Sequence, residues 1–135
     1  MPLLNWNEGY SVNVKQIDTQ HKKLVDIINE LHDGMKAGKS KEVIGKILDE
    51  LINYTGYHFK TEEDLFDKYG YPDKNTHKRQ HGDFVDQVVK LKEDYDSGKS
   101  VLSIDLMNFL KDWLLKHIAG TDKKYTPFLN SKGVS

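Results

Sequence analysis

Six histidines are spaced along this 135-residue chain in a pattern that could bind metal ions. His58 and Glu62 lie four residues apart, and so do His77 and His81. In a helix, four residues span about 400° of turn and about 6 Å of rise, so both members of a pair face the same direction. Each pair could therefore converge on one ion or on two neighbouring ions. The metal-capable side chains at inward positions are His21, His58, Glu62, His77, His81 and His117.

Four segments with helical periodicity must position these side chains. They span residues 18–35, 41–69, 73 or 75 to 95, and a stretch from about 100–103 through His117. Gly38, Gly70 followed by Pro72, and Gly98 are typical helix-end residues. Strand patterns are absent and the connections are short, so sequential helices are expected to pack antiparallel. The sequence predicts an all-α, up-down-up-down antiparallel four-helix bundle.

The 135 residues suffice for one domain with its own hydrophobic core. Residues 1–17 lack helical periodicity and predict an extended N-terminal arm, with Trp6 and Tyr10 packing against the bundle. Residues 130–135 are polar and are expected to form a loosely held tail. Asp18, one turn before His21, is expected to be a helix N-cap, with orientation of His21 as the alternative role.

Composition excludes several classes of function. The net charge of -1 gives no field that would attract nucleic acid or an anionic membrane. Because cysteine is absent, disulfides, zinc ribbons, iron–sulfur clusters and thiol nucleophiles are impossible. No apolar run approaches the roughly 20 residues that span a bilayer, and no signal peptide is visible. We therefore expect a cytoplasmic protein without membrane insertion.

The histidines could also be ordinary core residues, because an isolated inward-facing histidine is usually just hydrogen-bonded. Burying five imidazoles and a carboxylate without partners, however, would cost several kcal/mol per group, and a shared metal site removes that cost. These ligands exceed the four of a tetrahedral zinc site, and His77 to His81 lacks the glutamate of HExxH. Mixed nitrogen and oxygen ligation favours iron, with manganese or copper as alternatives. Two ions bridged by carboxylates fit this ligand count.

A second bridging carboxylate is needed, and Asp122 is the candidate. It follows His117 by five residues, which in a straight helix turns it roughly 140° away from the histidine. Gly120 lies between the two and can break the helix. We therefore expect the fourth helix to bend or end near Gly120, so that Asp122 returns to the site.

The order and spacing of these residues resemble the ligand signature of the hemerythrins. The matching motifs are His21, His58-Phe59-x-x-Glu62, His77-x-x-x-His81 and His117-Ile118-x-x-x-Asp122. Trp6, Trp113-Leu114 and Asp122-Lys123-Lys124-Tyr125 resemble the bacterial branch, the bacteriohemerythrins. The resemblance covers nearly the whole chain.

The resemblance implies a non-haem centre of two iron ions. His77, His81 and His117 would bind one iron, and His21 and His58 the other, which keeps an open position for dioxygen. Glu62 and Asp122 would bridge the irons together with an oxo or hydroxo group. The family pattern also implies an oxygen pocket, whose apolar wall lacks acids that could release peroxide. Its residues are Phe59, Trp113, Leu114 and Ile118.

Three functions are compatible with such a centre. The first is reversible dioxygen binding for transport, storage or delivery to an oxygen-consuming partner enzyme, in which case the protein is not an enzyme. The second is a sensor of oxygen, iron or nitric oxide. The third is a di-iron oxidase or peroxidase, which the absence of Glu-x-x-His motifs disfavours.

Overall fold

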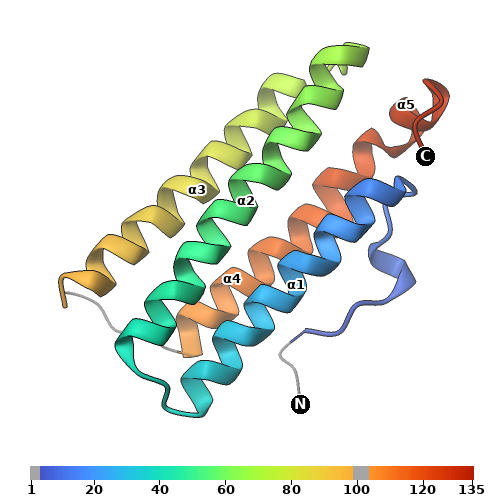
Figure 1. Ribbon diagram of the computed structural model, residues 1–135. Coiled ribbons are helices and arrows are strands. Elements are labelled where there is room, and N and C mark those ends of the chain that lie inside the picture. Colours follow the sequence, from blue (N-terminus) through green and yellow to red (C-terminus); the bar gives the residue numbers. More distant parts are fainter. Residues whose placement is uncertain (1–3, 99–103) are drawn as a thin grey trace.

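Four long helices run alternately up and down in the computed structural model, which describes residues 4–98 and 104–135 (Figure 1). Their bounds are α1 Lys15–Lys36, α2 Lys41–Tyr69, α3 Lys74–Asp96 and α4 Ile104–Lys116. The described residues contain no strand. The predicted all-α four-helix bundle is therefore confirmed. The expected start of the fourth helix, at residues 100–103, lies outside the described residues.

The ends of α2 follow from local chemistry. The Ser40 hydroxyl accepts a hydrogen bond from the Val43 amide at 3.3 Å, which satisfies one free donor of the first turn. At the other end Gly70 has φ 73°, a left-handed conformation that glycine adopts without a Cβ clash, and its amide bonds to the Phe66 carbonyl. The helix therefore has the bounds that the sequence predicts.

The start of α1 differs from the prediction. The helix begins at Lys15, after Val14, so Asp18 is not its N-cap. The Asp18 carboxylate instead accepts hydrogen bonds from the Ser11 hydroxyl at 2.5 Å and the Val12 amide at 2.8 Å. Asp18 therefore fastens the N-terminal arm to the first turn of α1, and it does not orient His21.

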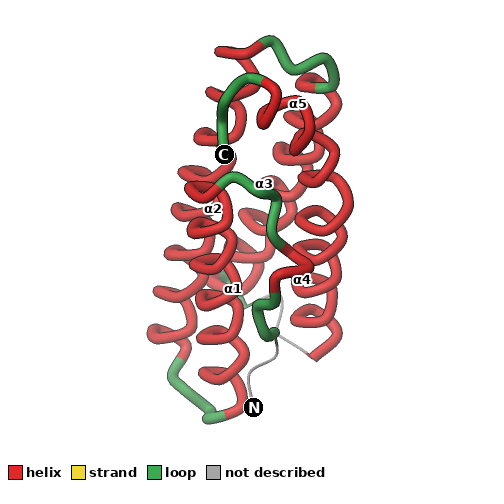
Figure 2. The backbone as a smooth tube through the Cα atoms, turned by 90° about the vertical axis from the view of Figure 1, so that its right-hand side faces the viewer, coloured by secondary structure: helices red, strands yellow, loops and turns green. Residues whose placement is uncertain are grey.

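The N-terminal arm lies along the outside of the bundle beside α1 (Figure 2). It contains one 3-10 turn, η1 (Glu8–Tyr10). The Leu4 amide donates to the Asn29 side chain, and that side chain donates to the Leu4 carbonyl, both at 2.8 Å. Trp6 and Tyr10 pack against the bundle, as predicted.

Three short elements follow α4 without an intervening loop. They are a π-helical turn, η2 (His117–Thr121), a 3-10 turn, η3 (Asp122–Tyr125), and a short helix, α5 (Thr126–Ser131). Here the chain meets the N-terminal arm again: the Thr126 hydroxyl donates to the Val12 carbonyl at 2.7 Å and the Asn130 amide group to the Asn13 carbonyl at 3.1 Å. Residues 130–135, expected as a loose tail, thus begin with a residue that contacts the arm.

The interior has two apolar clusters separated by a polar layer. The smaller cluster lies at the end formed by the arm and α5 and consists of Val12, Val14, Ile17, Phe66, Tyr71, Tyr125 and Leu129. The larger one contains, among others, Leu24, Ile28, Leu51, Phe59, Phe84, Leu110, Leu114 and Ile118. On α1, for example, the buried His21 lies between Ile17 of the smaller cluster and Leu24 of the larger one. Among the described residues, no helix has an apolar stretch long enough to cross a membrane.

Candidate metal centre

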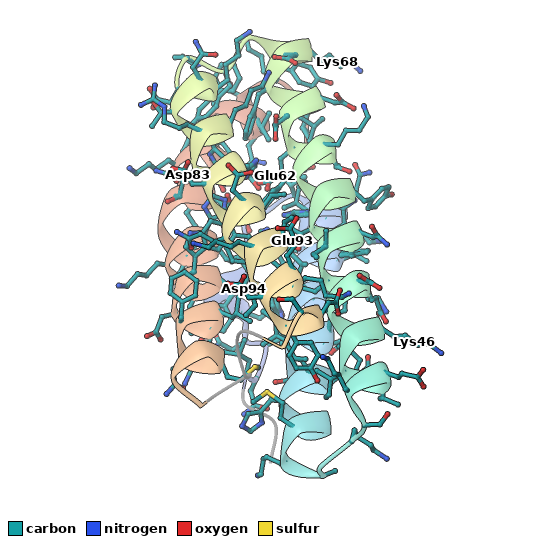
Figure 3. The ribbon with its side chains drawn as sticks, turned by 90° about the vertical axis from the view of Figure 1, so that its left-hand side faces the viewer. Lys46, Glu62, Lys68, Asp83, Glu93 and Asp94 are labelled. Atoms are coloured by element: carbon teal, nitrogen blue, oxygen red, sulfur yellow. The ribbon has the colours of Figure 1, made fainter. Side chains whose placement is uncertain are left out.

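The structure brings together seven buried side chains from α1, α2, α3 and the two turns that follow α4. None of them is more than 4% exposed. Glu62 lies between the helices, whereas Asp83 and Glu93 of α3 are exposed to solvent (Figure 3). The seven are His21, His58, Glu62, His77, His81, His117 and Asp122.

These side chains form two overlapping groups whose ligand atoms lie within 4.8 Å of one another. The first, called the three-histidine group, contains His77, His81 and His117 with both carboxylates. The second, the two-histidine group, contains His21 and His58 with the same two carboxylates. Glu62 and Asp122 thus belong to both groups, as a pair of carboxylates between two adjacent ions would.

Asp122 reaches the cluster through the π-helical turn. The Asp122 amide bonds to the His117 carbonyl, and this i to i+5 pattern stacks residues that are five apart. Gly120 does not break the chain: its φ is not positive, and the helical path continues through it. The expected return of Asp122 and the end of the regular α-helix near Gly120 are confirmed, since α4 ends at Lys116. The cause differs from the prediction: a π-helical turn, and not a break at the glycine, brings Asp122 back.

The two carboxylates are surrounded by imidazoles. Asp122 Oδ1 lies 2.9 Å from Nε2 of both His77 and His117, and Oδ2 lies 3.0 Å from Nε2 of His21. Glu62 Oε1 lies 2.9 Å from His58 Nε2 and 3.4 Å from His81 Nε2. Every histidine of the cluster therefore turns its Nε2 atom toward a carboxylate.

These contacts decide the protonation states of the acids. Burial alone would raise the pKa of Asp122, but His117, His21 and His77 outweigh it and hold the pKa well below its usual value. Burial and the charge of Asp122 likewise oppose the ionisation of Glu62, yet His58 and His81 hold the pKa of Glu62 below its usual range. Both acids are therefore carboxylates at neutral pH, the form that binds metal ions.

The pKa values of two histidines of the cluster are shifted in opposite directions. Burial lowers the pKa of His58 despite the opposing effect of Glu62, so His58 is a neutral imidazole at neutral pH. Burial also acts to lower the pKa of His117, but the adjacent Asp122 carboxylate outweighs it and the pKa is raised. The Nε2 atoms of His117 and His81 lie 3.1 Å apart, a distance that suits one proton between them. A proton on His117 can thus supply positive charge that a metal ion would otherwise provide.

The donor set fits a metal centre on the chemistry of its buried atoms. Nε2 of His21, His58 and His77 and both oxygens of Glu62 and Asp122 are buried, and apart from the contacts within the cluster they have no hydrogen-bond partner. Leaving so many polar atoms unsatisfied in one layer would be very costly. Metal ions satisfy all of them together, because imidazole nitrogen and carboxylate oxygen are both good ligands.

The four predicted oxygen-pocket residues lie next to this polar layer. Phe59, Leu114 and Ile118 are buried, and Trp113 is partly buried against the same apolar cluster. The Phe59 ring stacks on the His81 ring with the two centroids 3.7 Å apart, and the Trp113 ring stacks on the His117 ring with the centroids 4.5 Å apart. Both aromatic rings therefore contact the three-histidine group directly.

The sequence interpretation missed two side chains that contact the ligands. Gln20 Oε1 lies 2.7 Å from His58 Nδ1, and Glu63 Oε2 lies 3.1 Å from His81 Nδ1. Spacing could have found both: Gln20 follows Ile17 by three residues, and Glu63 follows Phe59 by four, so each shares a helix face with a core residue.

Tyr125 lies inside the same end of the bundle. It is fully buried, its ring centroid lies 5.7 Å from that of His77, and its hydroxyl has no hydrogen-bond partner. Burial, reinforced by the charges of Glu62 and Asp122, raises its pKa well above the usual value. Tyr125 is therefore a neutral phenol beside the carboxylates.

A bundle whose central layer consists of histidines and carboxylates defines a class of helical metal-binding proteins. The sequence profile of the Hemerythrin HHE cation binding domain matches residues 12–129. The chain belongs to the hemerythrin family. The resemblance inferred from the ligand pattern is thereby confirmed.

Individual relatives agree with this assignment. A bacteriohemerythrin of Methylococcus capsulatus is 39% identical over 132 residues, which cover 97% of this chain and 100% of the relative. A hemerythrin-like protein of Naegleria gruberi is 36% identical over 121 residues, covering 90% of this chain and 89% of the relative. The crystal structure of wild-type hemerythrin superimposes with a TM-score of 0.87 at 38% identity, covering 93% of this chain and 96% of that one.

Proposed function

We propose that this protein binds dioxygen reversibly at a centre of two iron ions and serves oxygen transport, storage or delivery. The observation that carries the proposal is the division of seven buried ligands into two groups that share Glu62 and Asp122. In this proposal the three-histidine group holds one iron, and the two-histidine group holds the other with a position left free for dioxygen. Glu62 and Asp122, which belong to both groups, would hold both irons, and an oxo or hydroxo group would complete the centre.

The residue count supports the location of the free position. The three-histidine group offers three imidazoles and two carboxylates, whereas the two-histidine group offers one imidazole fewer. Two ferrous ions supply the electrons that dioxygen takes up when it binds. The side chains of the protein hold the ions, exclude water and do not donate protons to the bound oxygen.

The surroundings suit binding better than catalysis. Phe59, Leu114 and Ile118 are buried apolar side chains, and none of them can donate a proton to a reduced oxygen species. Tyr125 is the nearby hydroxyl with a raised pKa, so it gives up its proton reluctantly. We therefore propose a binding protein and not an enzyme. A cytoplasmic location and an oxygen-consuming partner enzyme remain predictions.

The proposal is tested first by metal analysis and then by optical spectroscopy. Protein reconstituted anaerobically with ferrous iron should contain two irons per chain. A visible charge-transfer band should appear when oxygen is admitted and disappear when oxygen is removed. Rapid irreversible bleaching with peroxide in solution would support an oxidase instead, and one equivalent of zinc in the isolated protein would overturn the di-iron proposal.

A matched pair of variants ties the band to the cluster. His58→Gln removes a ligand of the two-histidine group and should abolish the band. His32→Gln removes a histidine that lies on the same helix as His21 but contacts only Asp33, at 3.9 Å, and should leave the band unchanged.

A further inference from the structure

The outer nitrogens of two histidines, one from each group, contact side chains of different charge. His58 Nδ1 faces the neutral amide of Gln20 at 2.7 Å, and His81 Nδ1 faces the carboxylate of Glu63 at 3.1 Å. Gln20 is buried, whereas the Glu63 side chain is 30% exposed. The two groups are therefore unequal beyond the ligands themselves.

The orientation of the Gln20 amide is fixed by a chain of hydrogen bonds. The Thr61 hydroxyl donates to the Tyr57 carbonyl at 3.1 Å, so toward Gln20 it can only accept. Gln20 Nε2 donates to that hydroxyl at 3.2 Å, which leaves Oε1 facing His58. His58 must then carry its proton on Nδ1, and its Nε2 lone pair points to the centre.

Glu63 imposes the same tautomer on His81 with a stronger acceptor. A carboxylate only accepts hydrogen bonds, so His81 Nδ1 carries the proton and Nε2 faces Glu62 and His117. A carboxylate behind a ligating imidazole increases its basicity, whereas a neutral amide does so much less. His81 is therefore the better electron donor of the two.

Resting on the proposed function, we infer that Gln20 and Glu63 are positioning residues that make the two metal positions unequal. Glu63 strengthens the three-histidine group, and Gln20 orients His58 without adding charge to the two-histidine group. The centre then holds one ion tightly in a complete ligand set. The other ion, next to the free position, is held less tightly.

Glu63 and Gln20 line two different cavities of the bundle. Glu63 and His81 line a cavity of about 400 Å³ between α2 and α3, together with Phe59 and Gly82. Gln20 lines a separate cavity of about 590 Å³ with Tyr54 and Tyr57. A charge placed on either side therefore acts mainly on the nearer group.

The experiment exchanges the two charges without changing side-chain shape, using Co²⁺ as the probe of the metal-free protein. Calorimetry of wild type should show two binding steps. Glu63→Gln should weaken the tighter step roughly 10- to 100-fold, the usual effect of removing such a partner, and leave the other step unchanged. Gln20→Glu should tighten the weaker step and leave the tighter step unchanged.

Two variants control for charge alone. Asp64→Asn removes an exposed carboxylate that lines the same cavity as Glu63 but bonds to Lys60. Gln16→Glu adds a carboxylate at an exposed position of the Gln20 cavity, one turn away. Both should bind Co²⁺ as wild type does. Nitrogen NMR of the metal-free protein should also show protonated Nδ1 on His58 and His81, and Gln20→Ala should change only the His58 signal.

The outcomes separate this inference from the proposed function. If wild type takes up fewer than two Co²⁺ ions, the di-iron proposal fails and this inference fails with it. If wild type binds two ions but Glu63→Gln matches Asp64→Asn, only this inference is overturned. Equal weakening of both steps in a folded Glu63→Gln protein, checked by circular dichroism, would also overturn it.

Discussion

His117 Nε2 lies 2.9 Å from Asp122 Oδ1, although the two residues are five positions apart in a continuous helical path. A regular α-helix would direct these side chains about 140° apart. The π-helical turn removes that divergence, and π turns of this kind are frequent at functional sites. The close approach of His117 and Asp122 therefore depends on their separation by five residues within the π-helical turn.

This geometry predicts that Gly120→Ala keeps the centre intact. A Cβ at Gly120 would meet no atom within 4 Å, and alanine favours helical backbone by up to about 1 kcal/mol over glycine. We expect unchanged Co²⁺ stoichiometry and an unchanged or slightly raised melting temperature. Insertion of one alanine between Ala119 and Gly120 should instead rotate Asp122 by about 100° and reduce the stoichiometry. Loss of binding in Gly120→Ala would show that the site needs glycine flexibility.

Metal removal should destabilise the whole bundle. An ion that binds only the folded chain raises the free energy of unfolding by about 2.7 kcal/mol when its concentration is 100 times its Kd. For a domain of this size we expect chelation to lower the melting temperature by about 10 °C, and re-addition of metal to restore it. Differential scanning calorimetry checks this. Equal melting temperatures with and without metal would contradict a site formed by the folded core.

Phe59→Ala should both destabilise the protein and expose the centre. The Phe59 ring is buried and stacked on His81. Its loss should therefore lower the free energy of unfolding, measured by urea titration, by about 3 to 5 kcal/mol. The cavity between α2 and α3 would then open onto the His81 ring. We expect irreversible oxidation of the reconstituted iron centre to become roughly tenfold faster, as water gains access. Val85→Ala enlarges the same cavity without removing a ring from His81, and its oxidation rate should stay near that of wild type.

Asp18→Ala tests the attachment of the N-terminal arm. It removes two partly buried hydrogen bonds to an acid, one from Ser11 and one from Val12. The free energy of unfolding should fall by about 2 to 3 kcal/mol. Ser11→Ala removes the hydroxyl donor alone and should cost about 1 kcal/mol in the same denaturant titration. If Asp18→Ala costs no more than Ser11→Ala, the bond from the Val12 amide contributes nothing to stability.

The sequence was sufficient for the bundle and for the residues that meet in its centre. The helical segment 41–69 and the pairs at four-residue spacing follow directly from the helical period. Asp122 was found by counting ligands, because a second carboxylate was needed. The end of the regular helix near Gly120 was also predicted, but the π turn was not, because the choice between a π turn and a break at a glycine depends on tertiary packing and not on local propensity.

Helical spacing can place Gln20 and Glu63 on inward faces, but it does not say which ligand each of them contacts. The pairing of Gln20 with His58 depends on how α1 and α2 are rotated against each other, and that of Glu63 with His81 on α2 and α3. The role of Asp18 was missed because the arm that it binds has no periodicity. Such contacts need the three-dimensional arrangement.

Asp122 contacts both His21 near the start of the chain and His77 in its middle. With ions bound, the centre becomes a cross-link that closes a loop of about 100 residues, comparable in chain topology to a long-range disulfide. The chain cannot expand fully until that cross-link opens. Ion release and global unfolding should therefore share a rate-limiting step, so the working lifetime of the protein would be set by how slowly its two chain ends separate.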